Sequence, residues 1–121
     1  MLTKSARLTS PNDFARTTKS GLRVTTSHFV GYLYRHNDAS QKSAKVGLII
    51  GKKVGNSVVR HRLARQIRHA LAIENFPTNS FLVIRALGTN DAHYTIDIQS
   101  EIAELSRKLI SKAEKLEVGV K

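Results

Sequence analysis

The sequence predicts an α+β fold in which helices pack on a β-sheet as a two-layer sandwich. Segments with helical and strand periodicity follow one another in the order helix, two or three strands, helix, strand, helix. The clearest strand is 80–86, where a short apolar run is flanked by polar residues, as expected when both faces of a strand are covered. With 121 residues and no internal repeat, we expect residues 1–121 to form a single domain.

The first half of the chain is expected to contribute two strands or three. Both faces of the strand 27–36 are apolar or aromatic, with Phe29 and Leu33 on one face and Val30, Tyr32 and Tyr34 on the other. One face must serve the core, and the other is half-covered or binds a ligand. We expect the polar segment 37–43 to be a hairpin loop, so that strand 45–52 pairs antiparallel with strand 27–36. Residues 23–26 are a candidate for a further short strand.

Three helices are expected. The first begins after Ser10, which can cap it, and ends at Gly21, where a left-handed cap is easy. The second opens with Ser57, directly after a turn. The third covers about 96–116, where apolar residues recur at helical spacing.

Positive charge is concentrated in the first two-thirds of the chain. The formal net charge is +11, and residues 1–73 hold 14 Lys and Arg against 2 acids, whereas residues 74–121 hold 6 against 7. No Asp or Glu occurs between residues 39 and 73. Such a segment repels itself unless an anionic partner neutralises it. Nucleic acid is a commoner partner than an anionic membrane for a compact basic domain.

The helix that opens with Ser57 is amphipathic in an unusual way. On a helical wheel an apolar arc of roughly 120° faces one side. The opposite arc holds His61, Arg62, Arg65, Arg68 and His69. Arg60 lies on the apolar side, so its long side chain should reach around the helix end toward the sheet. The helix therefore seats one stripe on the sheet and presents a basic stripe to a partner.

Composition excludes several other classes. The chain has no cysteine, so neither a disulfide nor a thiolate metal site is possible. No apolar run is long enough to cross a membrane, and the N-terminus lacks the apolar core of a signal peptide. We therefore expect a cytoplasmic protein that does not bind membranes.

Residues 52–68 carry a resemblance to a known family. The segment K-K-V-G-N-S-V-V-R-H-R-L-A-R-Q-I-R resembles the signature of the protein subunit of bacterial ribonuclease P, which typically reads K-K-x-G-N-A-V-x-R-N-R-x-K-R-x-I-R. R-L-x-x-x-x-D-F at 7–14 and F-V-x-Y at 29–32 follow the family order as well. The signature differs at Ser57, at His61, which replaces Asn, and at Ala64, which replaces a usual Lys.

The resemblance implies a fold and a function. The fold is a mixed four-stranded sheet with three helices in the order α-β-β-β-α-β-α, similar to the second domain of ribosomal protein S5. The function is that of an RNA-binding protein subunit of a ribonucleoprotein endonuclease, a hydrolase of tRNA processing that removes the 5′ leader of precursor tRNA. The RNA subunit carries the chemistry, with Mg²⁺ held by RNA and substrate rather than by a dedicated protein site.

The resemblance also implies two binding surfaces. One docks on the catalytic RNA and comprises Lys52, Lys53, Asn56, Arg60, His61, Arg62, Arg65 and Arg68. The other is a cleft between the first helix and the sheet that holds the single-stranded leader, formed by Phe14, Val30 and Tyr32 with Arg60 and His61 at its end. Thr18 stands where many members carry a second aromatic residue, so this cleft is expected to be shallower than usual.

We predict no catalytic or metal-ligating residue in the chain itself. The nine acids are scattered, and the arginines that flank His61 and His69 would repel a metal cation. A structural RNA-binding protein, such as a ribosomal protein, is the main alternative, because it would share the charge. A DNA-binding module is disfavoured, since the basic helix lacks the usual Asn or Gln readers of adenine. A stand-alone nuclease would need the missing catalytic groups.

Overall fold

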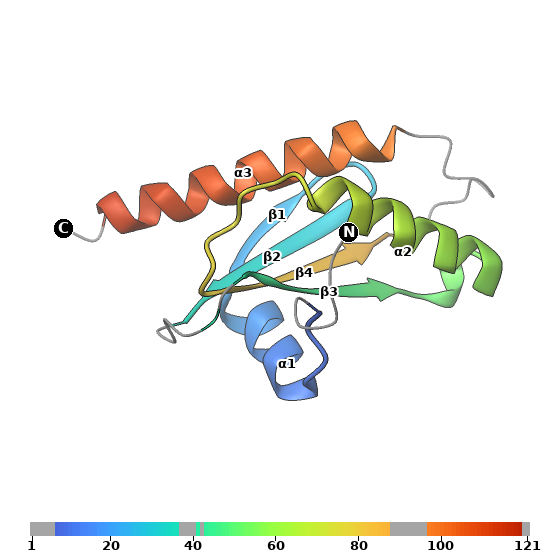
Figure 1. Cartoon of the computed structure of the whole chain (residues 1–121), viewed down its shortest axis with the longest axis horizontal. Coiled ribbons are helices and arrows are strands. Elements are labelled where there is room, and N and C mark those ends of the chain that lie inside the picture. The colour runs from blue at the N-terminus through green and yellow to red at the C-terminus, as the bar shows by residue number, and fades with distance from the viewer. Residues whose placement is uncertain (1–6, 37–40, 42, 88–96, 120–121) are drawn as a thin grey trace.

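The computed structural model describes residues 7–36, 41, 43–87 and 97–119, and for 116–119 the backbone alone. Within these ranges the chain forms three α-helices, four strands and a short 3₁₀ helix (Figure 1). Their bounds are α1 Pro11–Ser20, β1 Leu22–Thr25, β2 Phe29–Arg35, β3 Lys45–Ile50, η2 Lys52–Val54, α2 Ser57–Leu71, β4 Ser80–Ala86 and α3 Ile98–Gly119. The α+β class and the predicted order of elements are confirmed, and the candidate strand at 23–26 is β1.

The four strands form one mixed sheet in the order β1-β2-β4-β3. Strand β2 pairs antiparallel with β1 and β4, whereas β3 pairs with β4 in parallel. The predicted hairpin between 27–36 and 45–52 is therefore wrong, because β4 lies between these two strands. Residues 37–40 and 42 of that connection lie outside the described residues. Helix α2 makes the crossover that a parallel β3–β4 pair requires.

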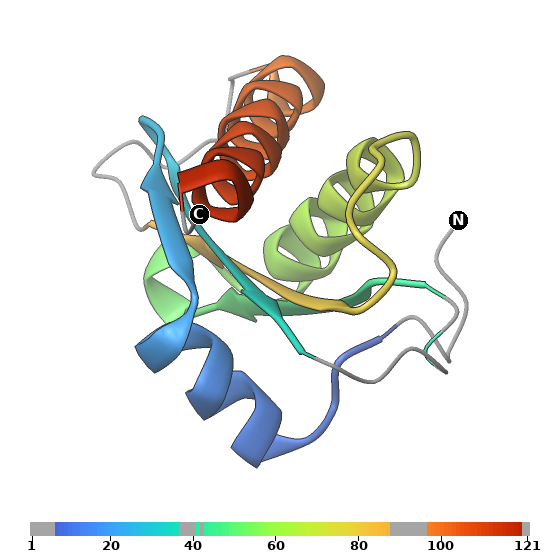
Figure 2. The ribbon, with the colours of Figure 1, turned by 90° about the vertical axis from the view of Figure 1, so that its left-hand side faces the viewer.

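The helices lie on both faces of the sheet. Figures 1 and 2 show α2 and α3 side by side on one face and α1 on the other. The larger core fills the space under α2 and α3 and includes Phe29 and Leu33, as predicted for one face of β2. A smaller cluster under α1 includes Val30 and Tyr32, from the opposite face of the same strand. Both faces of β2 are thus covered.

Helix α1 begins as predicted but ends differently. The Ser10 hydroxyl accepts a hydrogen bond from the backbone N–H of Asp13 at 3.4 Å. Gly21 has φ −78° and ψ 168°, so the expected left-handed cap is not formed. A Cβ at this position would lie 2.5 Å from the carbonyl oxygen of Thr17 and 2.9 Å from that of Leu33. A glycine is needed there because the chain passes close to two backbone carbonyls, and not because of its φ.

Candidate nucleic-acid interface

Helix α2 presents the basic face that the wheel predicts. Its apolar stripe is buried against the sheet and α3, with Leu63, Ile67, Ala70 and Leu71 each 3% exposed or less. The side chains of the opposite face are exposed: His61, Arg62, Arg65, Gln66 and His69. No acidic residue lies in the helix. A row of cations without counter-charges is suited to the phosphate backbone of a nucleic acid.

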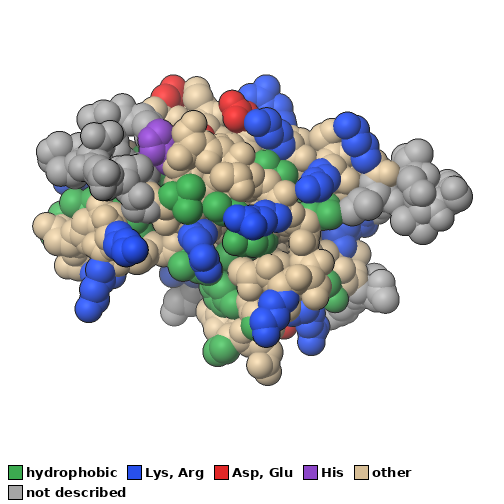
Figure 3. Space-filling model, turned by 180° about the vertical axis from the view of Figure 1, so that it is seen from behind, with side chains coloured by type: hydrophobic (Ala, Val, Ile, Leu, Met, Phe, Trp, Pro, Cys, Tyr) green, Lys and Arg blue, Asp and Glu red, His purple; other side chains and the backbone are tan. Residues whose placement is uncertain are grey.

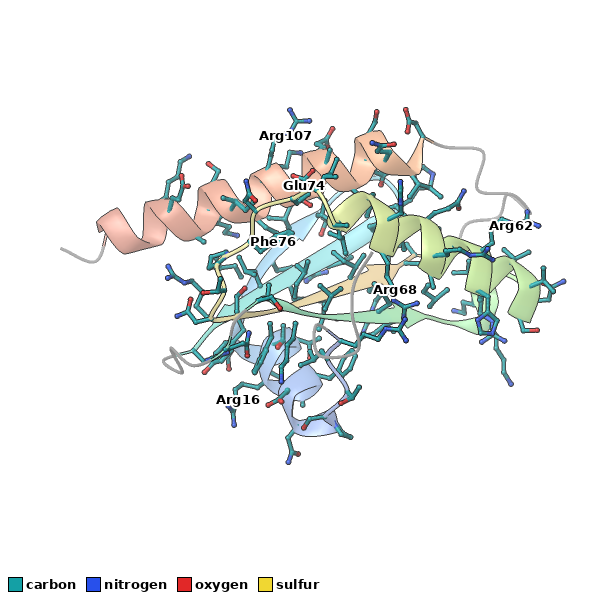
Figure 4. The ribbon with its side chains drawn as sticks, in the orientation of Figure 1. Arg16, Arg62, Arg68, Glu74, Phe76 and Arg107 are labelled. Carbon is teal, nitrogen blue, oxygen red and sulfur yellow. The ribbon has the colours of Figure 1, made fainter. Side chains whose placement is uncertain are left out.

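Two arginines of α2 lie apart from that exposed face. Arg60 and Arg68 are half-buried and line a cavity together with Leu48 and Ile50 of β3. The prediction that Arg60 reaches toward the sheet is confirmed. The prediction that Arg68 lies on the exposed basic face is wrong, because its position four and eight residues after Ala64 and Arg60 carries it along the side of the helix that borders β3. Figure 4 shows Arg68 directed from α2 toward β3, whereas Arg62 lies on the outer side of the helix. Burial, and in second place the positive charge of Arg7, lower the pKa of Arg68.

The segment before α2 positions the other predicted residues of this surface. Lys52 and Lys53 are exposed on η2. Gly55 has a φ of 156°, a backbone conformation that a side chain rarely adopts, and it links η2 to the helix. The side-chain oxygen of Asn56 accepts a hydrogen bond from the N–H of Val59 at 3.0 Å. Asn56 is therefore the N-cap of α2, which begins at Ser57 as predicted, and the side-chain oxygen of Asn56 is occupied by that role.

The three residues predicted for the second surface lie together under α1. Val30 and Tyr32 are 3% and 8% exposed and belong to the smaller core cluster, against which the half-buried Phe14 packs. The ring of Phe14 lies directly over the backbone of Gly47 in β3. Most of the ring surface of Phe14 and of Tyr32 is thus used for packing. Arg60 and His61 do not join these residues, because they lie beside Leu48 and Ile50, which pack against the larger core on the other face.

Arg85 is a residue of this face that the sequence reasoning missed. It lies on the central strand β4, in register with Val30 of β2 and Ile49 of β3. Since Val30 and Ile49 face the α1 side, the Arg85 side chain emerges on that side too, and it is exposed. The available signal was an arginine within a strand whose other residues are all buried. A cation among apolar neighbours on an open sheet face is suited to single-stranded nucleic acid.

Positive charge is not confined to α2. Seen from behind, Lys and Arg side chains are scattered over the molecule with apolar side chains between them, and few acids are visible (Figure 3). These separated cations do not form a site of their own. They add to the long-range field that attracts a polyanion.

The described residues contain no group of three His, Asp, Glu or Cys side chains that could hold a metal ion. The most elaborate carboxylate contact is structural. Glu101 of α3 accepts hydrogen bonds from the Thr26 hydroxyl at 2.6 Å and from the His28 N–H at 2.7 Å, and its other oxygen lies 2.8 Å from the His28 ring. Burial raises the pKa of Glu101, but these hydrogen bonds outweigh it and hold the pKa below its ordinary value. This contact ties α3 to the turn between β1 and β2.

No helix within the described ranges is long and apolar enough to cross a membrane.

Comparison with known proteins supports the resemblance carried by residues 52–68. The family model described as Ribonuclease P matches residues 2–110. The ribonuclease P protein component of Corynebacterium diphtheriae is 32% identical over 118 residues, covering 89% of this chain and 99% of the relative. That of Mycobacterium avium is 36% identical over 114 residues, covering 90% of this chain and 95% of the relative.

Solved structures agree with the fold. The chain resembles the ribonuclease P protein of Staphylococcus aureus with a TM-score of 0.75 at 24% identity, covering 88% of this chain and 99% of that one. For the protein of Thermotoga maritima the TM-score is 0.70 at 18% identity, with 84% and 96% covered. Together, the matched family model and the relatives above 30% identity show that this chain belongs to the ribonuclease P protein family.

Proposed function

We propose that the chain binds the RNA subunit of ribonuclease P through α2, binds the 5′ leader of precursor tRNA on the α1 side of the sheet, and so assists removal of the leader. The observation that carries this proposal is the separation of two different surfaces. The face of α2 is cationic and free of acids, and the other face combines apolar side chains with the exposed Arg85.

The α2 surface is suited to a folded RNA with closely spaced phosphates. Its exposed arginines project from a helix that is fixed by a buried stripe, so they need little reordering on binding. Arginine donates paired N–H groups to phosphate oxygens, and each phosphate contact releases counterions. The surface therefore supports tight, salt-dependent docking on the RNA subunit.

The α1 side of the sheet is suited to a leader of variable sequence. Apolar contacts and stacking on half-buried rings such as Phe14 do not depend on base identity, and Arg85 can neutralise a leader phosphate. Val30 and Tyr32 form the floor of this surface rather than an open stacking platform, because they are nearly fully covered. The leader would thus contact the exposed edges of Phe14 and Tyr32 and the guanidinium of Arg85.

The chemistry in this proposal belongs to the RNA. The described residues offer no ligand set for Mg²⁺, so no step is assigned to a metal held by the protein. RNA phosphates are suitable Mg²⁺ ligands and would hold the metal, which would supply an activated water for the hydrolysis. The protein's residues bind and orient the RNA and the substrate. We place this work in the cytoplasm, where bacterial tRNA precursors are made.

The test is a comparison of substrates with and without a leader. The affinity of the RNA subunit for precursor tRNA and for mature tRNA is measured with and without the protein. We expect the protein to tighten binding of the precursor more than that of mature tRNA. Equal tightening of both would instead identify the chain as a purely structural RNA-binding protein.

A further inference from the structure

A cavity of about 420 Å³ lies between the N-terminal part of α2 and the strand β3. It is lined by the apolar side chains of Leu48 and Ile50 and by three arginines, Arg7, Arg60 and Arg68. Its volume lies within the usual range for small-ligand pockets. We call these three arginines and the space between them the arginine slot.

Arg7 reaches the slot through a backbone contact that its sequence position alone would not reveal. It pairs in parallel with Val46 of β3, and the next residue, Leu8, donates its N–H to the Val46 carbonyl at 2.8 Å. Val46 faces the core under α2, so its partner Arg7 points to the same side of the sheet. Arg7 therefore lies near enough to Arg68 to repel it.

The spacing along α2 supplies the other wall. Arg60, Ala64 and Arg68 are four residues apart, which places them in one line along the helix. The small side chain of Ala64 leaves room between the two arginines, at the position where the family signature usually has Lys. A longer side chain at this position would occupy the space.

The charges of the slot are not balanced by the protein. No acidic residue lines it, whereas three arginines do. The Nε atom of Arg60 is buried and has no hydrogen-bond partner in the part of the chain that the structure describes. Burial and the charge of Arg7 also lower the pKa of Arg68. A buried donor without a partner and converging like charges both cost free energy, which an anion between them would recover.

We propose that the arginine slot holds one backbone phosphate of the RNA subunit, bound between Arg7, Arg60 and Arg68, with Ala64 providing the room. This inference rests on the proposed function and adds Arg7, which lies outside the α2 surface, to the RNA contacts. A phosphate of the RNA subunit is favoured over one of the leader, because the slot opens on the α2 side of the sheet and shares His61 with the exposed basic face.

The first test is Arg7→Ala, measured as affinity for the RNA subunit across a salt titration. Loss of one phosphate contact should weaken binding roughly tenfold or more and lower the slope of log K against log salt by about 1. Arg7→Lys should recover part of the affinity. The matched control is Arg107→Ala, an exposed arginine of α3 that points away from α2 (Figure 4) and should leave both quantities nearly unchanged.

The second test fills the slot without changing its charge. Ala64→Leu should weaken RNA binding by a similar factor, whereas Ala64→Ser should not, and thermal melting would establish that both variants are folded. Unchanged affinity in Arg7→Ala, or in a folded Ala64→Leu, would overturn the slot. Loss of affinity only for leader-bearing precursor would also overturn it, because the phosphate would then belong to the leader.

Arg62→Ala separates this inference from the proposed function. Arg62 lies on the exposed face of α2 and not in the slot. If Arg62→Ala weakens RNA binding and Arg7→Ala does not, the slot fails while docking through α2 stands. If neither variant weakens binding, docking through α2 fails as well.

Discussion

Each arginine of α2 has an environment set by its place in the helical repeat. Arg62 and Arg65 are exposed, whereas Arg60 and Arg68 turn toward β3. The wheel predicted the unusual direction of Arg60, because burial of an apolar stripe fixes where the other side chains of a helix point. It placed Arg68 on the exposed basic face, and for Arg68 it was wrong. The wheel contained no information on the partner of these two arginines, since Arg7 comes from a distant part of the chain.

Arg65→Ala should weaken binding to the RNA subunit and lower the slope of log K against log salt by about 1. Arg65 is exposed on the basic face, so its removal takes away a phosphate contact without disturbing the core. Titration from low to moderate salt measures the slope. A slope equal to that of the wild type would argue against a phosphate contact at this position.

Arg85→Ala should weaken binding of leader-bearing precursor by the assembled enzyme and leave mature tRNA unaffected. Arg85 is exposed at the centre of the α1 side, so its loss removes a leader phosphate contact worth roughly 1.5–3 kcal/mol, about ten- to 150-fold in affinity. Tyr32→Ala is a less clean test, because a side chain only 8% exposed also supports the fold. A parallel fall for both substrates would assign Arg85 to assembly.

At the scale of elements, local pattern predicted the helices and strands, but it did not predict which strands are neighbours. A polar seven-residue connection between two strands is compatible with a hairpin and equally with a step across one intervening strand, a distance of roughly 10 Å. Strand β4 enters between β2 and β3 because its continuous apolar run needs partners and cover on both sides. The position of β4 in the sheet therefore depends on contacts between segments that are distant in the sequence.

Gly47→Ala should displace α1 from the sheet. A Cβ at Gly47 would collide with the ring of Phe14, and overpacking of this kind costs about 1–3 kcal/mol. We expect lower stability in urea unfolding and weaker discrimination of precursor from mature tRNA, with binding to the RNA subunit retained. Gly51→Ala is the matched control, since a Cβ there meets no atom within 4 Å. Equal stability of the two variants would contradict the packing of Phe14 over β3.

Glu101→Gln should destabilise the protein at pH 7 and make its free energy of unfolding less dependent on pH in the acid range. The folded-state pKa of Glu101 is lowered, so its contribution is present above the unfolded pKa, about 4.3, and is lost as pH falls through the folded value. Loss of the charged acceptor for Thr26 and His28 should cost about 1–3 kcal/mol at pH 7 and little near pH 2.

Urea unfolding of Glu101→Gln at a series of pH values measures the effect. Glu104→Gln is the control, because its exposed pair with Lys108 should contribute little. A destabilisation independent of pH would show that Glu101 acts through packing alone.

At the scale of the whole molecule, the sequence was sufficient for the class of fold, the amphipathic α2 and the family. The grouping of Phe14, Val30 and Tyr32 under α1 was predicted, since strand alternation is a local property, but Arg60 and His61 were wrongly expected beside them. Arg7 and Arg85 could not be assigned, because their neighbours come from distant segments of the chain. Arg7 pairs beside β3, and Arg85 lies between β2 and β3 once β4 takes its place in the sheet. The surroundings of a single cationic side chain such as these follow from the register of strand pairing, which the sequence alone does not give.

The central claim is that this protein binds and positions RNA but does not itself perform the cleavage. The most direct measurement incubates precursor tRNA and Mg²⁺ with the protein alone, with the RNA subunit alone, and with both. We predict no cleavage by the protein alone, and faster release of the mature 5′ end by the assembled pair than by the RNA subunit at low salt. Release of the mature 5′ end by RNA-free protein, shown to be free of contaminating nuclease, would contradict the account.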